Sequence, residues 1–279
     1  MLLPQFYIDD IIKRGITEDI PYIDLATDLL IDKEQKGKAT FLAKQAGVVC
    51  GIDIAIRAIE LLDGSLEYEI FKKDGEWVEK GDVIATVTAK TNSLLKAERT
   101  ALNLLQHMSG VATATRLVVN EAKKGGKAHI ADTRKTTPTL RALEKYAVMM
   151  GGGHNHRFCL SDAAMIKDNH VDAVGGLKKA VDILRERLGH TVKIEVEARN
   201  FDELNEAIES GADIIMLDNM SCEDMAKAVE IVNGRAKTEA SGNVTIENVA
   251  QVAATGVDII SLGALTHSVM AMDISMKVK

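Results

Sequence analysis

The 279-residue chain has few prolines, cysteines and aromatic residues, and each shortage excludes a class of protein. Three prolines are too few for a chain built on disordered, proline-rich linkers. Its three cysteines, Cys50, Cys159 and Cys222, are widely spaced and form no C-x-x-C pair, which argues against a disulfide framework or a cysteine-rich zinc module. With aromatics at 4%, the core must consist mainly of Leu, Ile, Val, Ala and Met.

Long apolar runs are also missing. No stretch of about 18 apolar residues is present, so the sequence predicts no membrane span. The N-terminal segment has no basic leader, and Asp9 and Asp10 interrupt its apolar positions, which argues against a secretory signal. The sequence therefore predicts a reduced, cytoplasmic protein with no membrane partner. Its length accommodates a barrel together with a smaller domain.

Positive charge is concentrated in residues 131–170, although the formal net charge of the chain is -7. Against four acidic residues, this segment carries six basic ones: Arg134, Lys135, Arg141, Lys145, Arg157 and Lys167. A local excess of guanidinium and ammonium groups on an acidic protein predicts a site for a small, multiply charged anion. Nucleic acid would call for a broadly basic surface, so no nucleic-acid partner is expected.

The first 90 residues alternate short helical and short extended segments. Apolar spacing predicts helices over 8–14 and 52–62, and strands over 38–49 and 67–72. Residues 74–90 contain turn signals between strand-forming residues and predict a hairpin. A similar pattern occurs in biotinyl and lipoyl carrier domains, but those need a modified lysine at the hairpin tip, and no convincing counterpart is visible here.

A long helical segment over residues 91–124 is predicted to connect two domains, with Gly110 as a break between two helices. The expected division places an N-terminal domain at residues 1–107 and a catalytic domain at 108–279. The last residues of the chain are candidates for a return to the N-terminal domain.

Beyond residue 124 the sequence alternates short apolar strands with amphipathic helices, which is typical of parallel βα units. The predicted strands cover 128–132, 163–168, 193–198, 213–218, 237–242 and 258–263. The predicted helices cover 140–150, 174–188, 201–210, 223–232 and 246–254. Asn200 and Thr245 occupy the expected N-cap positions of two of these helices.

Each predicted strand ends in polar or glycine residues, as in Lys167, Glu197, Asp218 and Gly263. Repetition of this pattern predicts an α/β barrel whose active site lies at the carboxyl ends of the strands. The last two endings, EASGN and SLGAL, are small and suit a phosphate. An open, doubly wound sheet is the alternative, but no G-x-G-x-x-G follows a first strand.

Two sets of candidate ligands remain open at this stage. His154 and His156 have a spacing that zinc could use, but no third ligand is evident and Arg157 is adjacent, so anion recognition is favoured. Glu197 and Asp218 end successive strands, where they could pair with Lys167 or bind Mg²⁺ or ribose hydroxyls. Glu195 would share a strand face with Glu197.

Six runs of sequence carry a resemblance to a known family: AERTALNLLQHMSGVAT, ADTRKTTPTLRALEKYAVMMGGGHNHR, MIKDNH, IEVEAR, IMLDNM and EASGNVT. They resemble the quinolinate phosphoribosyltransferases, the decarboxylating nicotinate-nucleotide pyrophosphorylases, over residues from about 10 to 268. The resemblance implies an N-terminal α/β sandwich domain followed by an incomplete, seven-stranded TIM-like α/β barrel. It also implies a homodimer in which the N-terminal domain of one subunit covers the barrel mouth of the other, and leaves larger oligomers open.

The resemblance implies the activity and the site. The substrates would be quinolinate and phosphoribosyl pyrophosphate (PRPP), and the cofactor Mg²⁺ would be carried mainly by PRPP near Glu197 and Asp218, in a step of NAD biosynthesis. The implied catalytic residues are Lys135, Lys167, Glu197 and Asp218. The implied substrate-binding residues are these four together with Arg99, Thr133, Arg134, His156, Arg157, Ser241, Gly242, Gly263 and His267.

Within this set, the resemblance separates three roles. Arg99, otherwise an ordinary surface arginine, would reach quinolinate from the partner subunit, and its two carboxylates would contact Arg134, Lys135, His156, Arg157 and Lys167. Glu197 and Asp218 would hold the ribose hydroxyls and Mg²⁺ of PRPP. Ser241, Gly242, Gly263 and His267 would bind phosphate. One departure is visible, because Thr139 stands where the family usually has glycine after the RKTTP motif.

Two other functions are compatible with the residues. A related phosphoribosyltransferase could act on another pyridine carboxylate, although several cationic side chains favour a dicarboxylate. A non-catalytic sensor of a phosphorylated ligand would gain nothing from Glu197 and Asp218 without a metal, so their presence speaks against it.

Overall fold

The computed structural model describes residues 3–279, which divide into two compact units. The first unit contains the residues up to 116 together with 137–152 and 268–279, and the second contains 117–136 and 153–267. The predicted boundary after residue 107 falls inside one continuous helix, α4 (Thr91–Ala122). Among the described residues, no helix is long and apolar enough to cross a membrane.

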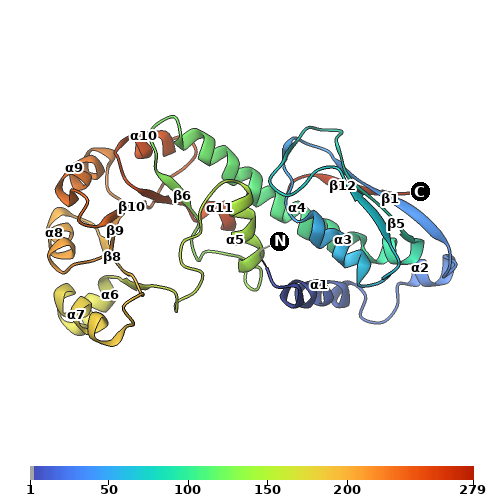
Figure 1. Cartoon of the computed structure of the whole chain (residues 1–279), viewed down its shortest axis with the longest axis horizontal. Helices are drawn as coiled ribbons and strands as arrows, with labels where there is room; N and C mark the ends of the chain where they lie inside the picture. The colour runs from blue at the N-terminus through green and yellow to red at the C-terminus, as the bar shows by residue number, and fades with distance from the viewer. Residues whose placement is uncertain (1–2) are drawn as a thin grey trace. The chain divides into compact units, whose positions relative to one another are not determined.

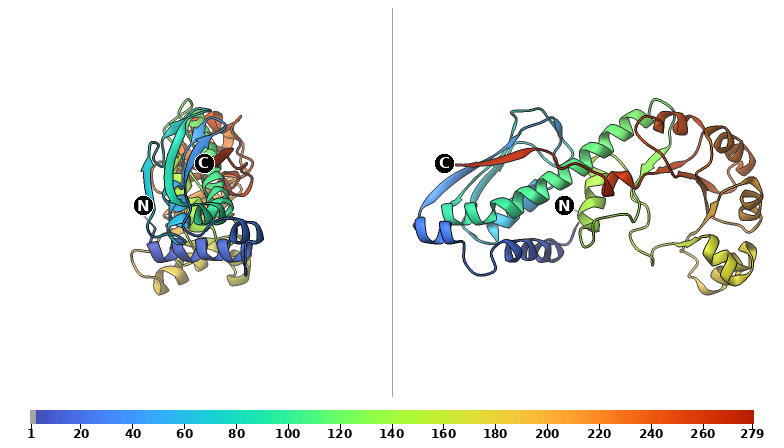
Figure 2. Two further views of the ribbon diagram at one scale, coloured as in Figure 1. Left: turned by 90° about the vertical axis from the view of Figure 1, so that its right-hand side faces the viewer. Right: turned by 180° about the vertical axis from the view of Figure 1, so that it is seen from behind.

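The first unit is built on a four-stranded antiparallel sheet in the order β12-β1-β5-β3. Its strands are β1 (Lys36–Ala43), β3 (Glu67–Ile70), β5 (Val83–Lys90) and β12 (Ile274–Val278). The C-terminal strand β12 pairs with β1, with Ala39 opposite Val278 and Ala43 opposite Ile274. Helix α3 (Ile52–Glu60) and the first part of α4 cover one face of this sheet (Figures 1 and 2), as in an α/β sandwich.

The segment predicted as a hairpin folds differently. Its two strands, β4 (Trp77–Val78) and β5, do not pair with each other: β4 pairs with β2 (Gly47–Val48), whereas β5 lies between β1 and β3. The turn between them is tied to β1, because the N–H of Gly81 donates to the carbonyl of Ala43 at 2.9 Å. Long-range pairing has therefore overridden the local hairpin signal.

Helix α4 runs through Gly110 without a break, so the predicted break there is wrong. Buried residues at helical spacing, including Leu94, Ala97, Ala101 and Leu105, keep one side of this helix in the core. A Cβ atom on Gly110 would lie 2.3 Å from the carbonyl oxygen of Met270. Glycine at this position allows the backbone of residues 270–271 to contact the helix.

Three further helices belong to the first unit: α1 (Gln5–Asp19), α2 (Leu25–Leu30) and α5 (Arg141–Met150). The side chain of Asp24 caps α2 by accepting from the N–H groups of Ala26 and Thr27. Helix α5 ends at Gly151, where a Cβ atom would lie 2.5 Å from the carbonyl oxygen of Ala112 in α4. Close packing of α5 on α4 therefore requires a residue without a side chain.

The second unit contains a six-stranded parallel sheet in the order β6-β11-β10-β9-β8-β7. Its strands are β6 (His129–Ala131), β7 (Ala164–Ile166), β8 (Ile194–Ala198), β9 (Ile214–Asp218), β10 (Lys237–Ser241) and β11 (Ile259–Ser261). All six predicted strands are present. The resemblance implied seven strands; beside the six of the sheet, the structure shows only a single parallel bridge between Ala131 and His154 in the described residues.

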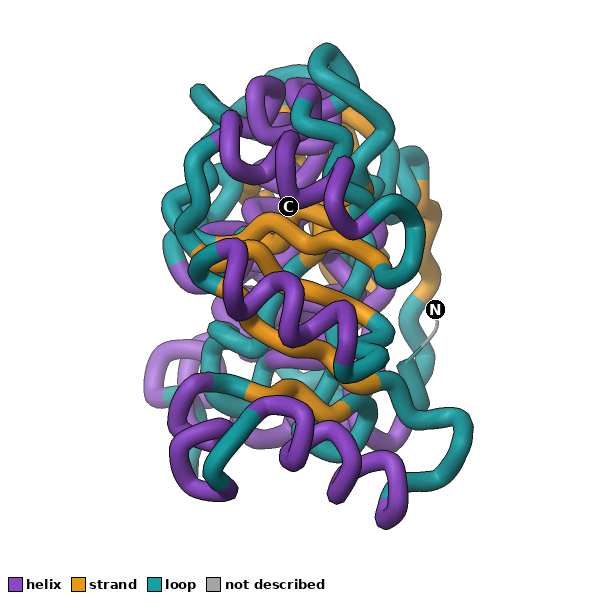
Figure 3. The backbone as a smooth tube through the Cα atoms, turned by 90° about the vertical axis from the view of Figure 1, so that its left-hand side faces the viewer, coloured by secondary structure: helices purple, strands orange, loops and turns teal. Residues whose placement is uncertain are grey.

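Helices cover the outer face of this sheet, as Figures 1 and 3 show. They are α7 (Leu177–Arg187), α8 (Phe201–Glu209), α9 (Cys222–Val232) and α10 (Val249–Ala254). Two shorter helices, α6 (Asp168–Val174) and α11 (Ala264–His267), follow the carboxyl ends of β7 and β11. The helix predicted over 174–188 is divided at Gly175 and Gly176, which both have positive φ. The architecture is that of an incomplete TIM-like barrel.

The two predicted N-caps have different outcomes. Asn200 caps α8, since its side chain accepts from the N–H of Glu203 at 2.9 Å. Thr245 does not cap α10, because that helix begins at Val249 after Asn248. A turn over residues 246–248 precedes it, and Asn248 accepts from the N–H of Thr245 instead.

Thr139, which stands where the resemblance leads us to expect glycine, has a φ of 71°. A β-branched residue in the left-handed region is strained. We expect Thr139→Gly to raise the free energy of unfolding by about 1 kcal/mol, because glycine adopts this φ without the steric cost. Urea unfolding would measure the change. The control is Thr137→Gly, at a neighbouring exposed position without a positive φ, which should lower stability; equal effects of the two substitutions would contradict the assignment.

An ion pair joins α1 to α3, because the carboxylate of Asp9 accepts from Nε and Nη2 of Arg57 at 2.8 and 2.7 Å. The hydrogen bond from Arg57 lowers the pKa of Asp9 from 3.8 to about 2. A depressed pKa in the folded state stabilises the fold above pH 4 or so, and this contribution disappears as the pH falls through about 2.

We therefore expect Asp9→Asn to destabilise the protein by about 1 kcal/mol at pH 7, with a difference from wild type that shrinks between about pH 4 and pH 2. Thermal unfolding followed by circular dichroism at several pH values would test this. Asp10→Asn is the control, since Asp10 pairs with Arg14 on the solvent-exposed side of the same helix. A difference that stayed constant down to pH 2 would show that the Asp9 charge does not contribute.

Candidate active site

Parallel pairing brings the carboxyl ends of the strands in the second unit together. Ala131 pairs with Ser261, Ser261 with Ser241, and Ser241 with Asp218, so these positions form one row across four strands. Side chains at these ends face the same edge of the sheet. This row fixes where the predicted site residues of the second unit can meet.

Three predicted cations line one cavity of about 530 Å³ next to β7, the last strand of the sheet order. They are Arg134, Arg157 and Lys167, and they come from three separate segments of the chain. The remaining wall is mainly apolar and includes Leu160, Ala164, Met165, Ile166, Val174, Ala180, Ile183 and Leu184. A cavity with cations at one side and an apolar wall suits a flat, apolar anion with more than one negative charge.

A second, smaller cavity of about 120 Å³ is acidic. Glu197 and Asp218 line it together with Asp168, Asp172, Glu203, Glu206 and Arg199. Glu197 also forms a close ion pair with Lys167, so one charge pair joins the cationic and the acidic cavity. The pairing of Glu197 with Lys167, which the sequence left open as an alternative, is therefore present. The oxygen ligands of this cavity are those that Mg²⁺ prefers.

The segment after β6 is anchored at the other end of the row. Thr133 accepts through its hydroxyl from the N–H of Lys135 at 3.1 Å, and the buried hydroxyl of Thr266 donates to the carbonyl of Lys135 at 2.7 Å. A Cβ atom on Gly263 would lie 2.9 Å from Cδ of Lys135 and 3.0 Å from the ring of His267. Gly263 thus brings Lys135 and His267 together, and both belong to the predicted set.

Asn219 and Asn243 are rim residues that the sequence analysis missed. Asn219 follows Asp218 directly, has a φ of 56°, and lies so close to Gly242 that a Cβ there would be 2.2 Å from its Oδ1. The amide of Asn243 donates to the same Oδ1 at 3.0 Å. The predicted phosphate segment 241–243 is therefore lined by two asparagine side chains. The available signal was an Asn directly after a predicted strand, because Asn tolerates the left-handed conformation better than most residues.

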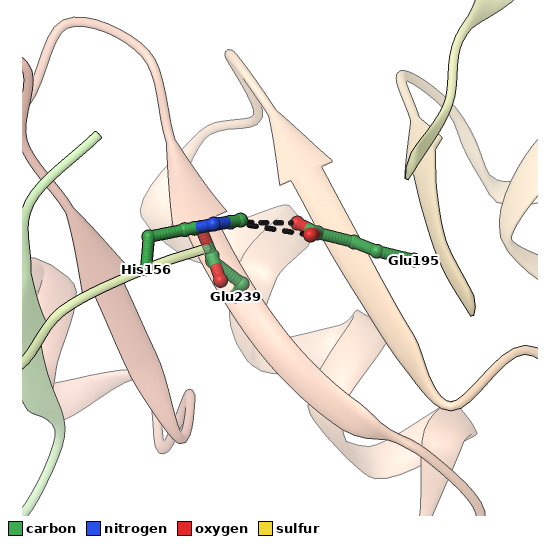
Figure 4. Close-up of side chains that lie close together, drawn as sticks. All are labelled: His156, Glu195 and Glu239. Carbon is green, nitrogen blue, oxygen red and sulfur yellow. Dashed lines mark hydrogen bonds and ion pairs between the residues drawn. The ribbon is translucent and has the colours of Figure 1, made fainter. Parts of the chain in front are cut away.

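Two buried carboxylates lie outside the predicted site set: Glu239 was missed, and Glu195 was considered only as a neighbour of Glu197 on the same strand face. Glu195 on β8 and Glu239 on β10 are each 1% exposed, and both lie against the ring of His156. Nε2 of His156 is 3.1 Å from Glu195 and 3.4 Å from Glu239. Figure 4 shows the three side chains close together. Burial lowers the pKa of His156, but the hydrogen bonds and charges of the two carboxylates outweigh it and raise that pKa to about 10. Glu195 itself has a pKa raised by burial.

The geometry does not pair His154 with His156 as zinc ligands. The ring of His154 packs edge to face on His129, with centroids 4.3 Å apart, whereas His156 turns to Glu195 and Glu239. Ligand atoms of these last three residues lie within 4.8 Å of one another. The two carboxylates that face His156 lie 39 or more residues further along the chain. Residue spacing in the sequence could therefore not indicate this cluster.

Asp132 at the end of β6 holds the same segment by its backbone. This carboxylate is fully buried, and it accepts from the N–H of His156 at 2.9 Å and from the amide of Asn155 at 2.7 Å. The side chain of Arg157 is held in turn, because its Nη1 donates to the carbonyl of Ala163 at 2.9 Å. Arg157, one of the two arginines of the cationic cavity, is thus held by its guanidinium, and the residue before it is held by its backbone.

Arg99 belongs to the first unit and is not among the residues that meet in the second. It is exposed on α4 and lines a cavity of about 680 Å³ with Tyr7, Arg14, Thr139 and other residues of its own unit. The rest of the predicted set, from Thr133 to His267, lies in the second unit.

An α/β barrel with a cationic cavity, an acidic cavity and a small-residue rim defines a class of enzyme that binds anionic and phosphorylated substrates. Comparison with known proteins agrees. Residues 24–109 match the sequence profile of the quinolinate phosphoribosyl transferase N-terminal domain, and residues 111–277 match that of the C-terminal domain. The chain therefore belongs to the quinolinate phosphoribosyltransferase family.

Individual relatives are similar over nearly the whole chain. A probable nicotinate-nucleotide pyrophosphorylase (carboxylating) of Bacillus subtilis is 45% identical, covering 96% of this chain and 92% of its own. A protein of the same name from Synechocystis is 43% identical, covering 99% and 94%. The solved structure of the nicotinate-nucleotide pyrophosphorylase of Francisella tularensis is 38% identical, with a TM-score of 0.95 and coverage of 99% and 98%. These similarities agree with the two-domain fold that the sequence predicted.

Proposed function

We propose that this protein transfers the phosphoribosyl group of PRPP to the ring nitrogen of quinolinate, with release of pyrophosphate and carbon dioxide and formation of nicotinate mononucleotide. The observation that carries this proposal is the cavity in which Arg134, Arg157 and Lys167 face an apolar wall. Quinolinate is a flat ring with two adjacent carboxylates, and such an anion matches three cations beside an apolar surface. Family membership supports the same reaction.

The reaction needs no covalent enzyme nucleophile. The pyridine nitrogen attacks the anomeric carbon as the bond to pyrophosphate breaks, and positive charge develops on the ribose in the transition state. The 2-carboxylate then leaves as carbon dioxide, because the quaternised ring nitrogen stabilises the carbanion, which takes up a proton from water. Holding two anions together in the attacking orientation accounts for several kcal/mol of catalysis.

The residues of this chain divide the task. Arg134, Lys135, Arg157 and Lys167 bind and orient the carboxylates, with His156 close by. Glu197 and Asp218 bind ribose hydroxyls. Ser241, Gly242, Gly263 and His267, at the small-residue end of the rim, bind phosphate with Thr133.

The cofactor proposed for this site is Mg²⁺, carried mainly by PRPP. Glu197 and Asp218 fit it, because their carboxylates line one cavity and offer the oxygen ligands that this ion prefers. When bound, Mg²⁺ neutralises charge on the pyrophosphate that leaves.

The first test is to follow nicotinate mononucleotide by chromatography with quinolinate, PRPP and Mg²⁺. We expect Arg134→Ala and Lys167→Ala to lower kcat/KM for quinolinate at least tenfold, which corresponds to about 1.4 kcal/mol. Lys237→Ala is the matched control, because Lys237 lies at the opposite end of β10 and pairs with Asp258. Turnover of a different pyridine acid, but not of quinolinate, would keep the site and overturn the substrate. Wild-type activity of both variants would overturn the site.

We further propose a homodimer in which Arg99 completes the partner's site, because Arg99 is exposed on the first unit whereas the other proposed ligands belong to the second. Co-expression of Arg99→Ala with Arg134→Ala then restores up to about a quarter of wild-type activity, since mixed dimers carry one intact site. The control pair, Arg134→Ala with Lys167→Ala, restores none, because both substitutions affect the second unit. Equal behaviour of the two pairs would exclude a shared site.

A further inference from the structure

Glu195 and Glu239 are charged groups buried inside the second unit, with no part in the substrate-binding set. A buried carboxylate is costly unless a hydrogen-bond donor or a cation compensates it. Here both carboxylates face the same atom, Nε2 of His156, at 3.1 and 3.4 Å (Figure 4). Glu195 comes from β8, Glu239 from β10 and His156 from the segment after α5, so three distant parts of the chain meet at this proton.

The other ring nitrogen of His156 is also engaged. The backbone N–H of Arg157 lies 2.7 Å from Nδ1, which acts as its acceptor. The two carboxylates favour a proton on both ring nitrogens, whereas this short contact favours a lone pair on Nδ1, because two N–H groups cannot face each other at that distance. In this conformation the short contact therefore leaves Nδ1 unprotonated. Whether or not Nδ1 carries a proton, Nε2 carries the proton that faces the two carboxylates.

Ring and backbone of His156 are therefore fixed independently. Asp132 accepts from the backbone N–H of His156, Glu195 accepts from its ring, and the Glu239 carboxylate lies 3.4 Å from the same ring nitrogen. The next residue is Arg157, whose guanidinium lines the cationic cavity. The orientation of the peptide that leads into Arg157 thus depends on where the His156 ring is held.

We propose that Glu195 and Glu239 are positioning residues: they hold the ring of His156, whose Nδ1 orients the peptide of Arg157, so that the Arg157 guanidinium is in place before the substrate binds. A guanidinium fixed in advance loses less conformational entropy on binding, and the gain appears in the affinity for the acid. This inference rests on the proposed function only in naming quinolinate as that acid.

The test compares Glu239→Leu with Glu239→Gln, and Glu195→Leu with Glu195→Gln, by kcat and by the KM of each substrate. The leucine variants remove the acceptor, and we expect the KM for quinolinate to rise roughly tenfold while the KM for PRPP stays within about twofold. The glutamine variants keep an oxygen that accepts from Nε2, and should restore the KM for quinolinate to within about threefold of wild type. Asp258→Asn is the control for lost stability, because Asp258 binds Thr238 and Lys237 at the opposite end of the sheet.

Three outcomes would overturn the proposal. The first is a wild-type KM for quinolinate in folded leucine variants. The second is a parallel rise of the KM values of both substrates together with a lowered melting temperature, as for a purely structural role. A stoichiometric metal in the purified protein that is lost in Glu239→Gln would make the three residues metal ligands instead.

Two further measurements keep the inference independent of folding and of the proposed reaction. If the leucine variants do not fold, the ¹⁵N spectrum of the His156 ring in the wild-type protein, assigned with His156→Gln, decides: a protonated Nε2 supports the proposal and an unprotonated Nε2 overturns it.

If the wild type does not turn over quinolinate, the proposed function fails, and titration calorimetry with phthalate as a dicarboxylate probe replaces the KM. Weaker phthalate binding in Glu239→Leu than in wild type, with Glu239→Gln within about threefold of wild type, would still support positioning, and equal binding of Glu239→Leu and wild type would refute it.

Discussion

A cavity that gathers Arg134, Arg157 and Lys167 must hold like charges together before any anion arrives, and the second unit is organised around this constraint. Repulsion between cations, and the cost of removing them from water, have to be offset by groups that do not block the cavity. Nearby carboxylates meet that need. Glu197 pairs with Lys167, while the buried Glu195 and Glu239 face the ring of His156, the residue before Arg157.

The same arrangement explains why cationic and acidic cavities adjoin. The ion pair between Lys167 and Glu197 belongs to both, so an aromatic acid held by the cations would lie next to carboxylates that suit ribose hydroxyls and Mg²⁺. Parallel strands make this possible, because their carboxyl ends meet at one edge whatever their separation along the chain. Residues of opposite charge can therefore lie a few ångströms apart even when they are far apart in the sequence.

Close backbone approach is the second recurring requirement. Gly110 and Gly151 allow helices of the first unit to contact neighbouring backbone, and Gly263 lets Lys135 and His267 lie together in the second. Thr139 illustrates the other property of glycine, its freedom to adopt a positive φ. Thr139 has a φ of 71°, which glycine would adopt without strain. A glycine in a helical sequence can therefore indicate close packing as readily as the end of a helix. The predicted helix break at Gly110 was wrong for that reason.

The sequence by itself determined the strands of the barrel, the polar residues at their ends and the excess of positive charge in residues 131–170, because alternating apolar segments and local charge are properties of neighbouring residues. It could not determine which strands pair around β5, that α4 continues through Gly110, or that Glu195 and Glu239 converge on His156. Those features depend on contacts between residues far apart in the chain. Only the folded chain brings such residues within hydrogen-bonding distance, and only there does the cost of burying a carboxylate decide which donor it must contact.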